Sequence, residues 1–319
     1  MPANVETMLS SNAEIPWHKE GKIIEGYPKT TKEAIELAGL DWDVALEPMK
    51  LMDGKDVEGF FGVVRQDTKK TLGVVGKRYQ PIQNSRAFEF LDDSLGSDLK
   101  IETAGSLNGG KRIWAMAKMV DKKIVIAGED VVDQYLLITN GHDGGNSCKG
   151  RFTPIRVVCQ NTLNAALGTR AEWAISVRHT ASADTKLEVA ADVIAKAMAA
   201  AEATAELYEG LAEIKLSVKQ FDEYLGQLIK DEEGKKNTRR QNERDAITDL
   251  FDTGRGMDIK TIRHTAWAAY NAVTEHVDHH RTVKGDNGRL SSIAFGNGNR
   301  LKQKALKTAA EMFLVGAGT

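Results

Sequence analysis

The 319-residue chain is predicted to be an α+β protein, with an N-terminal domain of antiparallel β-hairpins and helices followed by an all-helical C-terminal domain. In the first half, short β-branched runs alternate with turn-forming residues, as in hairpins. From about residue 183 the chain is alanine-rich and repeats apolar residues at helical spacing. We therefore expect an N-terminal arm over 1–30, an α+β core domain over 31–181 and a helical domain over 182–319.

The composition excludes several classes of protein. Hydrophobic residues make up 41% of the chain, charged residues 28%, and the formal net charge is −2. These values exclude a disordered chain and a uniformly basic nucleic-acid coat, but not a local basic groove. The chain has two cysteines, no pattern of a signal peptide at its start, and no apolar run near the roughly 20 residues that span a bilayer. We expect a cytoplasmic protein without a membrane partner.

The first half begins with a polar, aperiodic stretch up to about residue 30, which favours an arm or loop. Thr30 or Thr31 then caps a helix that stops at Gly39. Asn84 is expected to cap a second helix. The turns QDTKK and SLNGG predict hairpins, the second with positive φ at its glycines, Gly109 and Gly110. The predicted strands are 41–46, 58–65, 71–76, 99–104, 111–119, 122–126, 131–139 and 173–179.

The second half reads as consecutive helices broken by polar, glycine-containing segments. The first is the alanine-rich stretch over 183–216, whose residues have high helix propensity. Asn299 is expected to cap the last helix. The remaining predicted helices are Val218–Ile229, Arg239–Asp252, Ile259–His279 and Arg300–Leu314.

The segment Thr139–Leu167 concentrates the polar chemistry of the first half. A glycine-rich loop over 140–146 follows a strand, a β-branched run over 155–158 comes next, and Asn161 and Thr162 resemble a helix start. Backbone amides of such a loop can bind a phosphate. The spacing excludes a P-loop and a dinucleotide fingerprint, and a purely structural turn is the alternative.

Five residues in or near this segment raise metal or thiol chemistry: His142, Asp143, Cys148, Cys159 and His179. Their spacings match no paired zinc-ligand pattern. Cys159 at a helix start, with His142 or His179 as base, would be a nucleophile, whereas the end of an apolar strand favours core packing. We expect no catalytic residue, no metal and no cofactor.

Basic residues beside aromatic residues favour a groove for single-stranded nucleic acid, where cations neutralise phosphates and rings stack on bases. Arg156 shares a strand face with Pro154 and Val158, which suggests either a functional surface or a buried ion pair. Charged hairpin ends are the alternative explanation. Further basic residues of this domain are Arg65, Lys69, Lys70, Arg170 and Arg178. The expected nucleic-acid-binding residues are Lys77, Arg78, Tyr79, Lys111, Arg112, Trp114, Lys149, Arg151, Phe152 and Arg156.

In the helical domain, WAAYNAVTEHVDHH places Glu275 near His279 and His276 near His280 at i,i+4 spacing. A divalent-metal face and a polar face at an interface are both compatible with this spacing, and the absence of HExxH excludes a zincin. The final amphipathic helix carries three lysines that suit either a docking surface or a solvated face: Lys302, Lys304 and Lys307.

Several motifs together carry a resemblance to a known family. TPIRVVCQNTLNAAL, with ITNGHDGG, ISVRHT and LGVVGKRYQPIQNSRAFEFLD, resembles the phage/plasmid-like protein family of unknown function, whose core motif is of the RVVCQNTL type. The resemblance implies carriage on phages and plasmids, near replication and recombination functions. The layout of hairpins and helices is also similar in outline to phage single-strand annealing proteins, a likeness at fold level alone.

These observations favour a phage or plasmid DNA-recombination protein that binds single-stranded DNA and promotes annealing without ATP, as a homo-oligomer. We expect it not to be an enzyme, and expect phage or host replication and recombination proteins among its partners. One alternative is a metal- or thiol-dependent enzyme at the loop of His142, Asp143 and Cys159. Another is an interaction protein directed against host defence.

Overall fold

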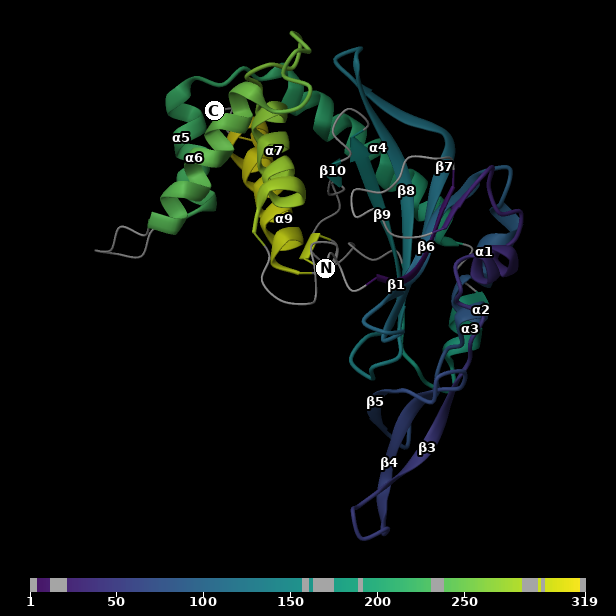
Figure 1. Cartoon of the computed structure of the whole chain (residues 1–319). Coiled ribbons are helices and arrows are strands. Elements are labelled where there is room, and N and C mark those ends of the chain that lie inside the picture. The colour runs from purple at the N-terminus through teal and green to yellow at the C-terminus, as the bar shows by residue number, and fades with distance from the viewer. Residues whose placement is uncertain are drawn as a thin grey trace. The chain divides into compact units, whose positions relative to one another are not determined.

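The computed structural model describes residues 5–11, 22–156, 161–162, 175–188, 192–230, 238–282, 292–293 and 296–315. The chain forms two compact units (Figure 1). The first comprises 1–121, 135–152 and 168–199, and the second comprises 122–134, 153–167 and 200–319. Segments from both sides of residue 181, where the sequence suggested a boundary, therefore belong to the second unit. No described helix has the length and apolarity that crossing a membrane requires.

The main sheet has the strand order β10-β9-β8-β7-β6-β1-β2, with β11 paired to β9. The β6–β7 hairpin turns through Asn108, Gly109 and Gly110, which all have positive φ, as expected for the two glycines. The predicted strand 122–126 is continuous with the one before it. The strands are β1 (Val5–Ser11), β2 (Lys22–Ile24), β6 (Leu99–Leu107), β7 (Arg112–Ile126), β8 (Asp130–Gly141), β9 (Cys148–Arg156), β10 (Asn161–Thr162) and β11 (Ile175–Val177).

Within the N-terminal segment that was expected as an arm or loop, two stretches form strands of the main sheet, β1 and β2. β1 pairs antiparallel with β6, and β2 adds to β1 in parallel. Met8 and Leu9 are buried, which explains why this short segment joins the sheet although its composition is polar. The expected helix start at Asn161 and Thr162 is wrong, because these two residues return as β10 and pair with Arg156 and Ile155.

A second, antiparallel sheet consists of β3 (Val44–Lys50), β4 (Asp56–Arg65) and β5 (Thr71–Gly76). The inner half of β4 is buried, whereas its outer half alternates between exposed and half-buried residues. Leu51 and Met52 at the β3–β4 turn are exposed. The outer half of this sheet is therefore a projecting part of the first unit, as Figure 1 shows.

Helices α1 (Thr31–Leu37), α2 (Asn84–Phe88) and α3 (Ala183–Glu188) lie on one side of the main sheet in the first unit (Figure 1). Thr30 caps α1 as expected, and Gly39 follows it with φ +66°. The expected cap of α2 is wrong. Gln83 is the N-cap, because the Asn84 amide donates instead to the carbonyls of Leu40 and Trp42. A 3-10 turn, η1 (Glu89–Ser94), continues α2.

The second unit is a helical bundle around α7 (Ala266–Glu275), whose residues are all buried. Trp267 and Tyr270 pack there with apolar side chains of β7 and β8, and the Trp267 Nε1 donates to Asp130 Oδ2 at 2.7 Å. A π-helical turn, η3 (His276–His280), extends α7. The other helices are α4 (Asp192–Glu213), which belongs to this unit from residue 200 on, and α5 (Val218–Leu228), α6 (Thr238–Thr253), α9 (Asn297–Ala309) and η4 (Ala310–Val315).

The predicted start of α7 lies too early in the sequence, and the predicted start of α9 lies too late. α7 begins after its cap, Thr265, and not near 259, because 256–264 form turns with positive φ at Gly256 and His264. α9 begins at Asn297 behind Gly296, so Asn299 lies inside the helix and is buried.

Candidate nucleic-acid interface

Three connections of the first unit come together at one end of its strands: the β5–α2 connection, the β6–β7 turn and the β8–β9 loop. The His142 backbone amide donates to the Lys111 carbonyl at 2.9 Å. The Tyr79 hydroxyl donates to the Gly141 carbonyl at 3.5 Å. A Cβ on Gly144 would lie 2.7 Å from Val75, so only glycine fits where the loop meets β5. The motifs GKRYQP, NGGKR and GHDGG are therefore neighbours.

Two buried histidines hold these connections together. His142 Nε2 lies 2.8 Å from Asn84 Oδ1 and donates to it, because the Asn84 amide nitrogen already serves two carbonyls. His179 Nδ1 accepts from the Ile82 backbone amide at 3.0 Å, and its ring stacks on Tyr79 with centroids 4.8 Å apart. Both histidines thus act as positioning residues for the turn that carries Tyr79.

The same burial keeps both imidazoles neutral. Desolvation lowers the pKa of His142 to about 3, and the neighbouring His179 lowers it in the same direction. Desolvation lowers the pKa of His179 to about 4, although the Asn146 carbonyl opposes the shift. A general acid or base for neutral pH needs a pKa near 7, so neither histidine fits that role.

Asp143 shapes the β8–β9 loop. Its Oδ1 accepts from the backbone amides of Gly145 and Asn146 at 3.0 and 3.1 Å, and Asn146 Nδ2 also donates to this carboxylate. Gly144 follows with φ +79°. A Cβ on Gly73 would overlap the Asp143 backbone, so the loop lies directly against β5. The Asp143 carboxylate is therefore used inside the loop.

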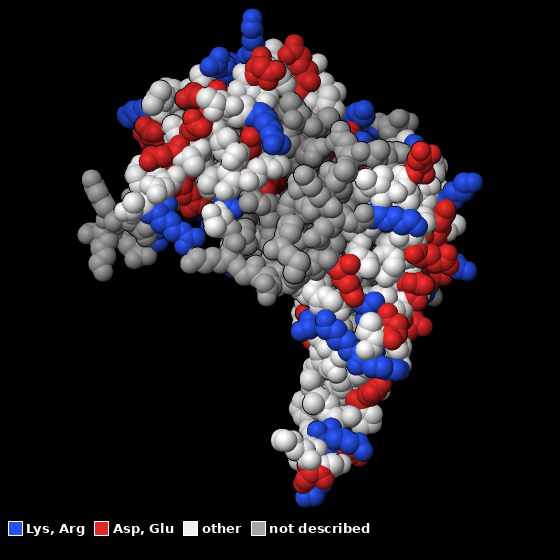
Figure 2. Space-filling model, in the orientation of Figure 1, with Lys and Arg blue, Asp and Glu red and all other residues white. Residues whose placement is uncertain are grey.

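Four exposed cations surround the meeting point of the three connections: Lys70, Lys77, Arg78 and Lys111. None of these four forms an ion pair with another residue that the structure describes. The Lys70 amine lies directly over Gly109, two residues before Lys111. Figure 2 shows Lys and Arg side chains gathered where the three-stranded sheet meets the loops, with acidic side chains nearby. We call these four residues the cationic rim.

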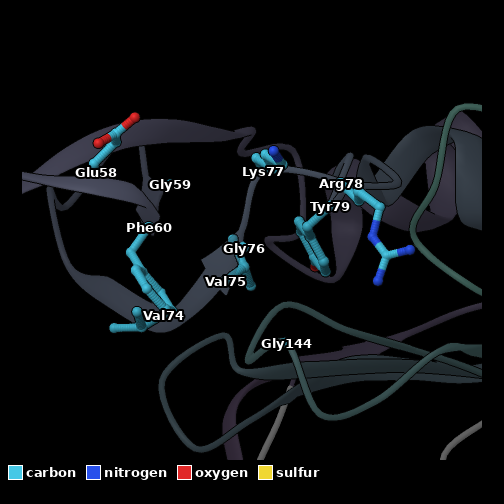
Figure 3. Close-up of a pocket in the computed structure, with 10 residues that line it drawn as sticks. All are labelled: Glu58, Gly59, Phe60, Val74, Val75, Gly76, Lys77, Arg78, Tyr79 and Gly144. Atoms are coloured by element: carbon cyan, nitrogen blue, oxygen red, sulfur yellow. The ribbon is translucent and has the colours of Figure 1, made fainter.

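A hollow of about 640 Å³ adjoins the rim (Figure 3). Phe60 and Val74 lie together on one side of it, each 52% exposed, and Lys77, Arg78 and Tyr79 line the other side. The remaining lining residues are Glu58, Gly59, Val75, Gly76 and Gly144. The hollow thus combines an exposed aromatic ring with two cations that have no ion-pair partner in the described part of the chain, and its lining residues include one carboxylate, Glu58.

The structure brings together five of the ten expected nucleic-acid-binding residues: Lys77, Arg78, Tyr79, Lys111 and Arg112. Arg112 Nη2 donates to Asn146 Oδ1 at 2.7 Å, which ties it to the β8–β9 loop. Lys149 lies further along β9, opposite Ser176 of β11.

The structure corrects the assignment of three other expected residues. Trp114, Arg151 and Phe152 are 6%, 7% and 5% exposed, so they lie in the core and present no ring or charge to a polymer. Their strands have a buried second face, which alternation alone did not reveal. The Arg156 backbone lies in β9, and its side chain is outside the described residues, as is Arg170.

Arg65 is likewise not a surface cation. Its guanidinium bonds Glu6 and Asp67 at 2.7 Å and lies 4.2 Å from the centroid of the Trp42 ring.

The cysteine and metal hypotheses gain no support from the described residues. Cys148 is buried, and desolvation raises the pKa of its thiol to about 12, which suppresses the nucleophilic thiolate. Cys159 lies outside the described residues. Within the described ranges, no group of three His, Cys, Asp or Glu side chains is placed to hold a metal ion.

The polar face expected on α7 and η3 points into the helical unit. Asp278 and Lys302 form an ion pair at 2.8 Å, with their side chains 3% and 1% exposed. Glu275 is buried and accepts from the Arg255 backbone amide at 3.0 Å. Lys304 donates to the Gln227 and Leu228 carbonyls at the end of α5. Lys302 and Lys304 are thus used within the bundle.

Sequence reasoning missed Phe60 and Val74. The doublet Phe60–Phe61 carried a signal, because consecutive strand residues point to opposite faces and one ring had to face outward. The glycines of β4 and β5 were a second signal in the sequence, since glycine inside a strand often marks a close approach of another group.

A family model described as a domain of unknown function (DUF932) matches residues 71–303. No curated protein and no solved structure matches the chain. The matched range includes β5, the β5–α2 connection, the β6–β7 turn and the β8–β9 loop. The matched range begins at residue 71 and therefore does not include Phe60.

Proposed function

The chain belongs to the DUF932 family, and from this premise we propose that it binds single-stranded DNA at the cationic rim of its first unit and promotes strand annealing without nucleotide hydrolysis. The observation that carries the proposal is the gathering of Lys70, Lys77, Arg78 and Lys111 around three adjoining connections, without ion-pair partners among the described residues. Cations held near one another in this way attract a chain of phosphates.

The net charge of −2 makes this local arrangement informative. A protein without an overall positive charge gains little from nonspecific attraction to DNA, so its affinity depends on where the cations lie. The nearby carboxylates of Glu6, Asp67 and Asp143 are bonded to Arg65 or to loop amides. Their charges are therefore partly compensated, whereas Glu58 is a further exposed carboxylate that lines the hollow beside the rim.

The neutral histidines favour binding over catalysis at this place. Neither His142 nor His179 has a pKa near neutrality, and the Cys148 thiol is suppressed by burial. The two histidines therefore hold the surrounding chain in position by hydrogen bonds, and Cys148 packs in the core. Annealing needs only that two strands be neutralised and held close together, which a surface of cations provides.

We further propose that the protein acts as a homo-oligomer in phage or plasmid recombination. A single rim of four cations is a weak site, and repetition of the site in an assembly multiplies its affinity for a long strand. Light scattering with and without single-stranded DNA measures the molar mass. A monomer of unchanged mass on adding DNA argues against an assembly.

A salt titration of binding tests the proposal. Fluorescence anisotropy with a labelled 30-nucleotide single strand is measured between low and physiological salt. We expect the slope of log K against log salt to change by about 0.7 for each phosphate that is neutralised. Lys77→Ala and Lys111→Ala should each weaken binding at all salt concentrations and reduce the slope by about that amount.

Lys219→Ala is the matched control, because Lys219 is an exposed lysine of the helical unit, with its side chain 87% exposed. It should leave both affinity and slope unchanged. Absence of binding at the lowest salt rejects the proposal, and so does equal weakening by all three variants. The annealing step is followed separately with complementary labelled oligonucleotides in the absence of nucleotide.

A further inference from the structure

The hollow beside the rim has two chemically different ends. Phe60 and Val74 form an apolar end, whereas Lys77 and Arg78 form a cationic end (Figure 3). The Glu58 carboxylate lines the apolar side, and its negative charge repels a phosphate there. The arrangement fits a ligand that is flat and uncharged at one end and anionic at the other.

Two aromatic side chains line the hollow, Phe60 and Tyr79, and Phe60 offers the more accessible ring to a ligand. One face of Tyr79 is already stacked on His179, and the Tyr79 hydroxyl is bonded to the Gly141 carbonyl. Phe60 is 52% exposed at an outward position of β4. Burial of an exposed aromatic ring against a base is favourable for every base, because each base presents a π-face.

Glycines keep the space around Phe60 open. Gly76 lies opposite Phe60 in the β4–β5 register, and a Cβ on Gly76 would meet a single atom, the Gly59 carbonyl oxygen, at 4.0 Å. A Cβ on Gly59 would meet nothing within 4 Å. The volume of about 640 Å³ also lies within the range of about 300–1,000 Å³ that is typical of small-molecule sites.

We propose that this hollow receives one unpaired nucleobase, stacked on Phe60, with its flanking phosphates at Lys77 and Arg78. The inference rests on the proposed function and adds to it the part of the strand that is recognised. A base inside a duplex is stacked on both faces and paired at its edge. Phe60 is therefore a specificity-determining residue that favours single strands over duplex DNA.

Abasic DNA separates the base from the phosphate. Anisotropy is measured with a labelled thymidine 20-mer and with an abasic 20-mer that has the same phosphates. Stacking of one base on an aromatic ring is worth a factor of roughly 5 to 150 in affinity. We expect the full-length protein to bind the thymidine strand at least about fivefold more tightly than the abasic strand.

Three variants locate the preference. Phe60→Ala should bind both strands with the affinity of the abasic strand, and Phe60→Trp should restore the difference. Gly76→Leu fills the hollow and leaves every rim cation in place, so it should also abolish the preference. Val218→Ala is the control, because Val218 is an exposed apolar residue of the helical unit, 78% exposed.

The outcomes separate this inference from the proposed function. Binding of both strands with equal affinity, or a preference that survives in Phe60→Ala, overturns the base site and leaves DNA binding by the rim intact. Failure to bind either strand overturns both proposals. Thermal melting of each variant verifies its fold, and Gly76→Leu tests the site with Phe60 still present.

Discussion

His142 and His179 show how two single residues make the site rigid and make its stability depend on pH. Both are buried and neutral, and both bond to the same stretch of chain, His142 to the Asn84 side chain and His179 to the Ile82 backbone amide. Buried polar groups with defined partners specify one arrangement of the surrounding chain. The positions of Tyr79 and of the rim turn therefore follow from these two imidazoles.

Acid should destabilise the protein through the same pair. In the unfolded chain both histidines bind a proton near pH 6.5, whereas in the folded chain their pKa values are about 3 and about 4. The unfolded state therefore binds more protons below pH 6.5, and stability falls as the pH is lowered from 7 toward 4. We expect a loss of roughly 2 kcal/mol for each histidine between pH 7 and pH 5.

Urea unfolding at pH 5, 6 and 7 measures this dependence. His142→Gln retains a side-chain amide that can donate but cannot take up a proton, so it should remove about half of the change. Lys219→Gln is the control, because Lys219 lies on the surface of the helical unit with its side chain 87% exposed. Equal unfolding free energies at pH 7 and pH 5 for the unmodified protein would contradict the expectation.

At the scale of elements, Arg65 connects the end of β4 to β1. It bonds Glu6 of β1 and Asp67 of the β4–β5 turn, and it lies over the Trp42 ring. Its side chain is 6% exposed, while those of Glu6 and Asp67 are 31% and 43% exposed. The ion-pair network is thus buried at Arg65 and partly exposed to solvent at its two carboxylates. It joins the three-stranded sheet to the main sheet.

Arg65→Ala should lower the unfolding free energy by roughly 3 kcal/mol, because it removes the bidentate contacts and the stacking on Trp42. Arg65→Lys should recover a part of this loss, since an ammonium keeps the charge but not the planar fork. Urea denaturation at pH 7 measures both. The Arg65 guanidinium lowers the pKa of Asp67, so the difference between variants should shrink as Asp67 is protonated in acid. Unchanged stability in Arg65→Ala would show that β1 holds the sheets together without it.

The sequence predicted most strands and helices because their signals are local. β5, the capping of α1 by Thr30 and the glycines of the β6–β7 turn depend on alternation, caps and positive φ within a few residues. β1 was not predicted, because it is stabilised by pairing with β6, whose residues lie about a hundred positions away in the sequence. Lys77 and Lys111 were expected at a binding surface; both are exposed, and their role in binding stays a prediction. The burial of Trp114 and Phe152 was not predicted, because it depends on what covers the second face of each strand.

At the scale of the whole molecule, the helical unit is built from more than the C-terminal part of the chain. Ile124, Ile126 and Val132 belong to the same core as the residues of α7, and Asp130 accepts the hydrogen bond of the Trp267 indole. These four residues lie far before residue 182 in the sequence. The core of the helical unit therefore includes the end of β7 and the start of β8.

A fragment of residues 182–319 should accordingly fail to form a stable bundle, because it leaves apolar surface of α7 uncovered and the buried Trp267 Nε1 without its acceptor. A fragment of residues 122–319 contains all segments of the unit after 121 and should melt cooperatively. Circular dichroism compares the two melts. Trp267 is the sole tryptophan of the shorter fragment, so its emission should be that of a water-exposed indole. A cooperative melt with a buried indole in that fragment would instead make residues 182–319 an independent domain.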